Sequence, residues 1–252
     1  MFVKVVMYYV KLCVLFVALF GLGSAFASHK TLWENTIQLG GSAITGNSPA
    51  TTVTGKFTSA VDIDYPESVW GYNFLLEGRR ATALGIESAR FYRSEIEGRY
   101  LFSTRDYAYG KLNYTFNAFD TYDMVVRDSI GVGRILINDQ KQKLSLEGGP
   151  GSTHQRIAGS EMWQTQLIAH AESNYLLHVS QNGELTQNFI VDAGRLNSHL
   201  QSISAIRTKV MSNLDMQLSF EMNHYTKIAQ GSKNTKKTDT LTNITFIYCF
   251  HA

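Results

Sequence analysis

The sequence predicts an all-β fold: an antiparallel up-and-down transmembrane β-barrel of about 12 strands, the number of alternating segments along the chain. Side chains on a strand point to opposite faces in turn, so apolar residues at every second position mark a strand with one apolar face. The alternating segments run for roughly ten to fifteen residues, whereas strands of soluble sheets average about 5–6 residues. That length is typical of tilted strands that cross a membrane.

The start of the chain predicts export. Lys4 and Lys11 precede or border an apolar run over residues 12–22, and Ala25 and Ala27 then supply small residues at the spacing that signal peptidase reads. The run is too short for a membrane-spanning helix, which needs about 20 residues. We therefore predict a signal peptide over residues 1–27 and a single barrel domain over residues 28–252. An uncleaved N-terminal anchor is the alternative.

The charge and cysteine content exclude some classes of protein. Residues 1–27 hold two lysines and no acid, so residues 28–252 carry 21 basic side chains (23 less 2) and 21 acidic ones. Nucleic-acid-binding proteins usually show a basic excess, so we expect no nucleic-acid partner. Cys249 is the one cysteine after residue 27, and it cannot form an internal disulfide.

The strands can be placed from the alternation. In the clearest segment, Leu214, Met216, Leu218, Phe220 and Met222 alternate with polar residues. No run of 18 apolar residues follows residue 27, so no later segment qualifies as a transmembrane helix. We expect strands over residues 31–43, 50–63, 69–79, 86–101, 107–119, 123–137, 143–155, 161–172, 184–193, 197–210, 214–225 and 240–250. The eighth could extend past a bend to residues 175–177.

The connections indicate how the barrel sits in a membrane. An even number of strands closes the sheet with antiparallel neighbours, and closure leaves no unpaired backbone in lipid. With both termini in the periplasm, the odd-numbered connections face outward. The longest of them runs from Lys227 to Asp239 and carries Lys233, Lys236 and Lys237 among small polar residues, as expected of an external loop. The inner turns at 103–106, 138–140 and 181–183 are short.

The faces and the last strand predict location and partners. We expect the apolar face to contact lipid in the bacterial outer membrane, with aromatic girdles near the strand ends at Trp33, Trp70, Trp163, Tyr65, Tyr100 and Tyr107. Phe246, Tyr248 and Phe250 alternate near the C-terminus and resemble the signal that the barrel assembly machinery reads, with periplasmic chaperones as further partners. The alternative is a soluble periplasmic barrel with the two faces reversed.

Several glycine and turn patterns resemble a known family. They include Leu39-Gly40-Gly41, Gly131-Val132-Gly133 and the run Leu146 to Gly151. These stretches are similar to the YdiY-like family, described as putative salt-induced outer membrane proteins, although Ser152-Thr153-His154 follows where an aromatic-Arg pair is common. The resemblance covers nearly all of residues 28–252 and implies an outer-membrane barrel without an established substrate. Independently, strand glycines such as Gly131, Gly133, Gly148, Gly149 and Gly151 indicate strong curvature.

The inward face is the candidate functional surface. By parity it holds nine charged residues: Glu77, Arg79, Arg93, Glu95, Glu97, Arg99, Lys111, Arg127 and Glu147. Four acids and five bases leave this face nearly neutral. It is either a network of ion pairs that fills the interior or the wall of a narrow pore for small solutes. A barrel for acidic oligosaccharides would instead be lined mainly by Arg and Lys.

We expect no enzymatic activity, cofactor or metal. One enzymatic alternative rests on Ser152 and His154, which lie two residues apart on the predicted lipid-facing side, with Glu161 or Gln164 as a third group. Nucleophilic catalysis also needs a group that orients the imidazole and an oxyanion site, and no motif supplies them. The sequence therefore predicts a small-solute pore or an envelope-maintenance protein, with a structural or adhesion-type barrel as the second hypothesis and a rim lipid hydrolase as the third.

Overall fold

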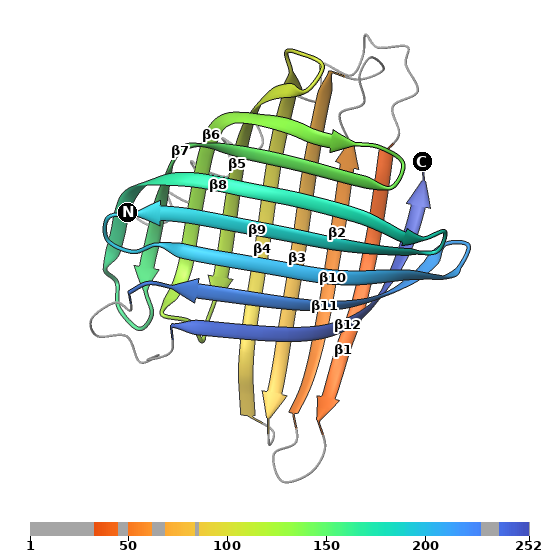
Figure 1. Ribbon diagram of the computed structural model, residues 1–252. Coiled ribbons are helices and arrows are strands. Elements are labelled where there is room, and N and C mark those ends of the chain that lie inside the picture. The colour runs from red at the N-terminus through yellow and green to blue at the C-terminus, as the bar shows by residue number, and fades with distance from the viewer. Residues whose placement is uncertain (1–32, 45–49, 62–68, 84–85, 228–236, 252) are drawn as a thin grey trace. The chain divides into compact units, whose positions relative to one another are not determined.

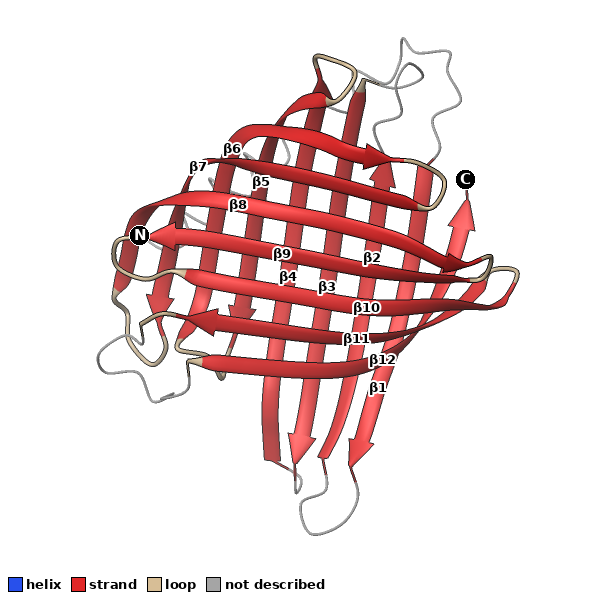
Figure 2. Ribbon diagram, in the orientation of Figure 1, coloured by secondary structure: helices blue, strands red, loops and turns tan. Residues whose placement is uncertain are grey.

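The computed structural model describes residues 33–44, 50–61, 69–83, 86–227 and 237–251. These residues form twelve strands. Figure 2 shows the strands and the turns that join them. The predicted signal peptide lies outside the described residues. The strands are β1 (Trp33–Ile44), β2 (Ala50–Val61), β3 (Trp70–Ala83), β4 (Ile86–Leu101), β5 (Asp106–Asn117), β6 (Tyr122–Asn138), β7 (Gln142–Ile157), β8 (Trp163–Ser180), β9 (Gly183–Gly194), β10 (His199–Met211), β11 (Leu214–Tyr225) and β12 (Thr238–His251).

The sheet closes on itself. Every strand pairs with its neighbours in the sequence, and β1 also pairs antiparallel with β12, from Glu34 opposite His251 to Gly40 opposite Thr245 (Figure 1). The closed antiparallel barrel confirms the predicted fold class. Among the residues that the structure describes, no helix is both long and apolar enough to cross a membrane.

The strand bounds agree with the alternation to within two residues except at the ends of β3, which continues to Ala83, and β8. This strand runs without interruption from Trp163 to Ser180, well beyond the expected end at residue 172. Its ladder with β7 continues to the pair Gln142 and Leu177. The apolar alternation lapses at Ser173, a polar residue on the outer face opposite Leu146, whereas Asn174 lies on the inner face, where its amide donates to Glu172. The connection at residues 228–236 lies outside the described residues.

The two faces of the sheet have opposite character. Apolar side chains stand exposed on the outer wall, with Leu167 83% and Ile130 66% exposed. Acidic side chains are enclosed within the barrel, where Glu97 is only 2% exposed. A soluble carrier would show the reverse arrangement, so this distribution fits a barrel with lipid outside.

The aromatic residues follow the predicted girdle in part. Trp70 and Tyr100 are exposed near one end of their strands, with ring centroids 4.6 Å apart, and Trp163 is exposed at the opposite end of the barrel. Tyr107 was wrongly assigned to this girdle. It is buried inside the barrel with Leu101 and Tyr109, because its position on β5 has inward parity. Tyr65 and the side chain of Trp33 lie outside the described residues.

On the last strand, Phe246 and Tyr248 are half exposed on the outer wall. The side chain of Phe250 lies outside the described residues, so the complete signal remains a prediction.

Glycines let β6 and β7 approach closely where these strands curve (Figure 1). A Cβ atom on Gly149 would lie 2.0 Å from the carbonyl oxygen of Ile130, and one on Gly131 would lie 2.2 Å from that of Gly148. Neither site can hold a larger residue without a backbone shift. Gly133 serves a different purpose, because the ring of Tyr107 packs where its Cβ would be.

We expect Gly149→Ala to destabilise the barrel by about 2 kcal/mol or more, because the added methyl group overlaps backbone that cannot rotate away. Gly110→Ala is the matched control. Its Cβ would meet only a methyl group of Ile130 at 3.9 Å, so its stability should change little. Guanidinium unfolding in phospholipid vesicles measures both. Equal stability of the two variants would contradict the close approach of β6 and β7.

Candidate functional site

The barrel interior brings charged side chains from many strands together. All nine residues assigned inward by parity have their side chains on this side of the wall: Glu77 and Arg79 on β3; Arg93, Glu95, Glu97 and Arg99 on β4; Lys111 on β5; Arg127 on β6; and Glu147 on β7. Residues two apart on a strand point to the same face, and the ladder sets neighbouring strands in register. The strand pattern alone thus gathers these groups into one enclosed space.

Lys111 lies at the centre of the most enclosed group. Its ammonium is 3.1 Å from a carboxylate oxygen of Glu97, 3.5 Å from one of Glu147, and also pairs with Glu172. The Lys111 side chain is only 8% exposed, and those of Glu97, Glu147 and Glu172 are still less exposed. Charged groups removed from water this far need partners of opposite charge, and Lys111 is the cation that all three carboxyl groups share. We call these four residues the central network.

Polar neighbours complete the central network. The Tyr107 hydroxyl donates to Glu147 over 3.0 Å, and the guanidinium of Arg99 pairs with Glu97. The amides of Asn174 and Asn188 donate to one oxygen of Glu172 over 3.0 and 2.7 Å. Each carboxylate therefore receives hydrogen bonds besides its contact with Lys111, which offsets the cost of burial.

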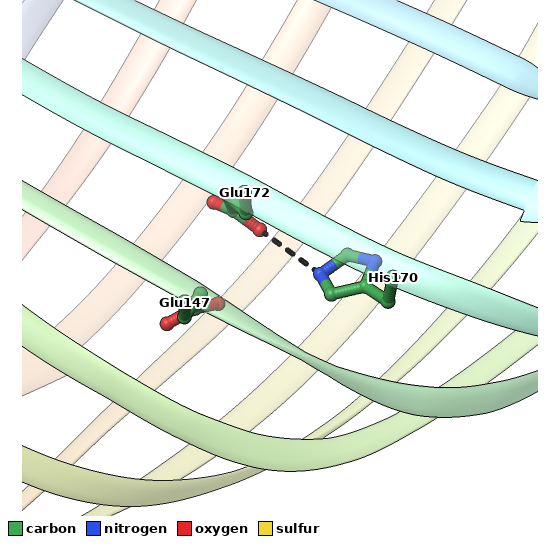
Figure 3. A group of neighbouring side chains, drawn as sticks. All are labelled: Glu147, His170 and Glu172. Carbon is green, nitrogen blue, oxygen red and sulfur yellow. Dashed lines mark ion pairs between the residues drawn. The ribbon is translucent and has the colours of Figure 1, made fainter.

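A second group surrounds Asp192 on β9. One carboxylate oxygen lies 2.7 Å from Nδ1 of His170, and the other lies 3.3 Å from the guanidinium of Arg127 and 3.7 Å from Nδ1 of His199. His170 also connects this group to the central network, because its Nε2 lies 3.7 Å from Glu172 (Figure 3).

A third group of ion pairs links β3 and β4 to β11, which lies on the other side of the seam between β1 and β12. Arg93 pairs with Glu77 over 2.7 Å, and Arg79 bridges Glu77 at 2.9 Å and Glu221 at 3.3 Å. The Arg79 guanidinium also stacks over the ring of Phe91, 3.9 Å from its centroid. The charged interior is thus continuous from β3 round to β11.

A cavity of about 460 Å³ lies between the second and third groups. Its wall includes Arg79, Arg93, Arg127, Asp192 and Glu221, and Lys111 lies at its boundary with the central network. The cavity extends to Phe119 and Asp120 in the turn between β5 and β6, at the end of the barrel away from β1's first residue and β12's last. The space is of the size that holds a small molecule.

Sequence reasoning missed several inward groups. Glu172, His170 and Asp192 were not assigned inward, nor was Glu221, although all lie within or at the end of predicted strands. The same parity rule would have found Glu221, which alternates with Phe220 and Met222. Cys249 is also inward, with its sulfur 2.9 Å from the Arg207 guanidinium.

Glu147, His170 and Glu172 place one ligand atom each within 4.8 Å of one another, the spacing of a metal-binding group (Figure 3). Glutamate and histidine would suit a divalent transition metal. The position between the two carboxylates is taken by the Lys111 ammonium, however. A metal ion would face that fixed positive charge, so this donor set does not fit a metal while Lys111 is present.

Ser152 and His154 face outward, as the sequence indicates, and join a chain of hydrogen bonds across three strands. Ser152 donates to Asp128 over 2.6 Å, its oxygen lies 3.1 Å from Nε2 of His154, and Nδ1 of His154 lies 2.9 Å from the Thr165 hydroxyl. Thr165, rather than Glu161 or Gln164, takes the third position. Ser152 thus donates its proton to Asp128 rather than to the imidazole.

The closed sheet, apolar outer wall and charged interior together define a bacterial outer-membrane β-barrel fold. The particular family follows from the sequence. The chain belongs to the family described as "Protein of unknown function, DUF481", whose model matches residues 37–250. This match confirms the resemblance to the YdiY-like family. No curated protein matches the sequence.

Solved structures share the fold at low sequence identity. An outer membrane channel from Pseudomonas putida F1 has a TM-score of 0.50 and 9% identity, over 87% of this chain and 96% of that chain. The translocator domain of the autotransporter NalP from Neisseria meningitidis has a TM-score of 0.44 and 12% identity, over 97% of this chain and 98% of that chain. The porin KdgM, in complex with disordered oligogalacturonate, has a TM-score of 0.44 and 7% identity, over 86% and 99%. These similarities concern the fold.

We expect Lys111→Met to destabilise the barrel by about 3–5 kcal/mol, because it leaves three enclosed carboxylates without their shared cation. The control is Arg134→Gln. Arg134 forms a 3.0 Å pair with Asp106, but its side chain is 62% exposed, so its loss should cost under about 1 kcal/mol. Guanidinium unfolding followed by tryptophan fluorescence compares the two. Similar losses would show that enclosure does not strengthen the central network.

Asp120 should make stability depend on pH. Burial in the β5–β6 turn raises the pKa of this carboxyl from 3.8 to about 6, with Asp239 adding to the shift and the backbone N–H of Thr121 opposing it. Between about pH 4 and pH 6 the unfolded chain ionises first, so stability falls as pH rises, on the order of 2 kcal/mol in total. Asp120→Asn should remove this dependence in unfolding titrations at pH 4, 5 and 6. A variant with an unchanged pH profile would refute the assignment.

Proposed function

We propose that the protein is a narrow outer-membrane barrel that admits small polar solutes into the 460 Å³ cavity and restricts their passage at the central network. This proposal rests on the relative positions of the cavity and the central network. The cavity reaches the turn at Asp120 on one side and Lys111 on the other. Beyond Lys111, the side chains of Glu97 and Glu147 fill the interior.

The cavity wall suggests the chemistry of the solute. Arg79, Arg93 and Arg127 contribute positive charge, while Asp192 and Glu221 contribute negative charge. Each of these charges already has a partner of opposite sign, which for Arg93 is Glu77, outside the cavity wall. The wall also includes Glu95, Asp120 and Asp239, so carboxyl groups outnumber cationic groups there. Such a surface suits a neutral or zwitterionic solute better than an acidic oligosaccharide.

The second candidate is a structural barrel with a plugged lumen. The observation in its favour is the enclosure of the central network, where Glu147 has 1% of its side chain exposed. A network of enclosed side chains from four strands, joined by ion pairs and hydrogen bonds, is well suited to hold a barrel rigid. In that case the cavity would be a closed recess, and the protein would contribute to the envelope through its surface.

The assembly partners also remain proposals. We propose that the outward aromatic pair Phe246 and Tyr248, with Phe250 two residues further along β12, is read by the barrel assembly machinery. This strand pairs with β1 to close the barrel, so its recognition would couple delivery to closure.

Single-channel conductance of the refolded chain from residue 28 in planar bilayers tests the pore. The informative variant is Lys111→Ala with Glu172→Ala, which removes a cation and an anion together and widens the constriction. We expect small steps from the wild type and steps several-fold larger from the variant. Asp106→Ala with Arg134→Ala removes an equally balanced but exposed pair, and its conductance should equal that of the wild type.

Heat-modifiable migration on gels establishes that each protein is folded. A folded wild type and a folded constriction variant that both fail to conduct would overturn the pore and favour the structural barrel. Larger steps in the exposed-pair control as well would mean that the current does not report on the central network.

A further inference from the structure

The outer wall carries a hollow that the lumen does not explain. A depression of about 570 Å³ lies over β1 to β5, with Leu39, Phe57, Leu76 and Tyr92 among the residues that line it. An adjoining depression of about 440 Å³ is lined by Val53, Arg80, Thr82 and again Tyr92. Both include Gly55 and Gly78, so the two hollows form one apolar groove that leads to an arginine.

The groove exists because two neighbouring positions lack side chains. Gly55 on β2 and Gly78 on β3 are partners in the ladder. A Cβ on Gly78 would approach Tyr92 no closer than 3.6 Å, and one on Gly55 would lie 3.9 Å from Leu39, so packing does not require glycine at either site. This distinguishes them from Gly131 and Gly149. Larger apolar residues there would be favourable in lipid, yet the wall is left open.

At the end of the groove, two arginines lie opposite each other. Arg80 on β3 and Arg90 on β4 are ladder partners on the outer wall. Like charges directly across a ladder repel. Glu87 pairs with both guanidinium groups, but it supplies one negative charge for two positive ones. The side chains of Arg80 and Arg90 are 71% and 47% exposed, so their remaining donors are accessible.

A register shift creates this arrangement. The β3–β4 ladder shifts between Ala81 and Thr82, so Glu87 is the partner of Thr82 and joins the face of Arg80. An irregularity of this kind re-aims a side chain at the end of a strand. Elsewhere, Arg156 meets Asp123 through two 2.7 Å hydrogen bonds, which match one cation with one anion. Arg80 and Arg90 therefore carry an excess positive charge, unlike the balanced pair of Arg156 and Asp123.

We propose that this surface binds one phosphate-bearing lipid, with an acyl chain in the groove over Gly55 and Gly78 and the phosphate on Arg80 and Arg90. Guanidinium groups match phosphate through paired hydrogen bonds. The arginines lie near the ends of their strands, which is the level of lipid headgroups, and the groove runs from them toward the middle of the wall. This site is independent of the lumen and of any solute it admits.

Native mass spectrometry of the folded protein in detergent, titrated with phosphatidylglycerol, tests the site. We expect retention of one lipid, at least tenfold weaker binding in Arg80→Gln with Arg90→Gln, and weaker binding in Gly78→Leu, which fills the groove. Glu87→Gln should strengthen binding, because it removes the competing carboxylate. Gly110→Leu and Arg134→Gln change comparable residues elsewhere and should bind as the wild type does.

Two further ligands test the contributions of the phosphate and of the acyl chain separately. Dioleoylglycerol, which lacks phosphate, should bind at least tenfold more weakly, and inorganic phosphate at millimolar concentration should not displace phosphatidylglycerol. Equal affinity across the variants would overturn the site. Displacement by free phosphate, with no effect of Gly78→Leu, would also overturn it, because the arginines would then be an anion site without a lipid chain.

Discussion

The pairing of β1 with β12 is the constraint on which the rest of the structure depends. In lipid an unpaired backbone group costs several kcal/mol, so the first and last strands must meet. Their ladder holds seven residue pairs, fewer than the twelve that join β1 to β2. Once this short seam is made, every strand has two neighbours, and the alternation of each strand becomes a division between an inner and an outer wall.

Closure also dictates what the interior must be. Half of each strand points inward, and the polar half cannot face lipid, so charged groups accumulate in the enclosed interior. The chain meets this cost by pairing charges from distant segments, as where Lys111 on β5 serves carboxylates on β4, β7 and β8. The cavity occupies the part of the interior that these side chains leave unfilled. Permeation and rigidity are therefore two outcomes of the same packing problem.

Much of the fold could be predicted from the sequence, because a period of two determines both a strand and its faces. The bounds of β4 and β11 follow directly from the alternation. The end of β8 did not, since the polar Ser173 interrupts the outward apolar pattern. Tyr107 was misplaced because an aromatic residue at a strand end fits either a girdle or a lumen, and parity decides between them.

The candidate site was less predictable. Parity identifies which charges point inward but not which of them meet, since that depends on the register of several ladders at once. Glu147 was recognised, whereas Glu172 and Asp192 were not, and it is these that give Lys111 and His170 their partners. Likewise, nothing in the sequence separates Gly78, where a Cβ would fit, from Gly149, where it would not.

The sharing of one lysine among three carboxylates has an evolutionary consequence. Lys111 and Glu172 lie 61 positions apart in the chain, yet loss of the Lys111 charge alone would leave Glu172, Glu97 and Glu147 without the cation that they share. Substitutions at these positions should therefore be accepted in compensating sets, while exposed positions such as Leu167 exchange freely among apolar residues. Lineages of this barrel would then diverge quickly outside and in rare, coordinated steps within.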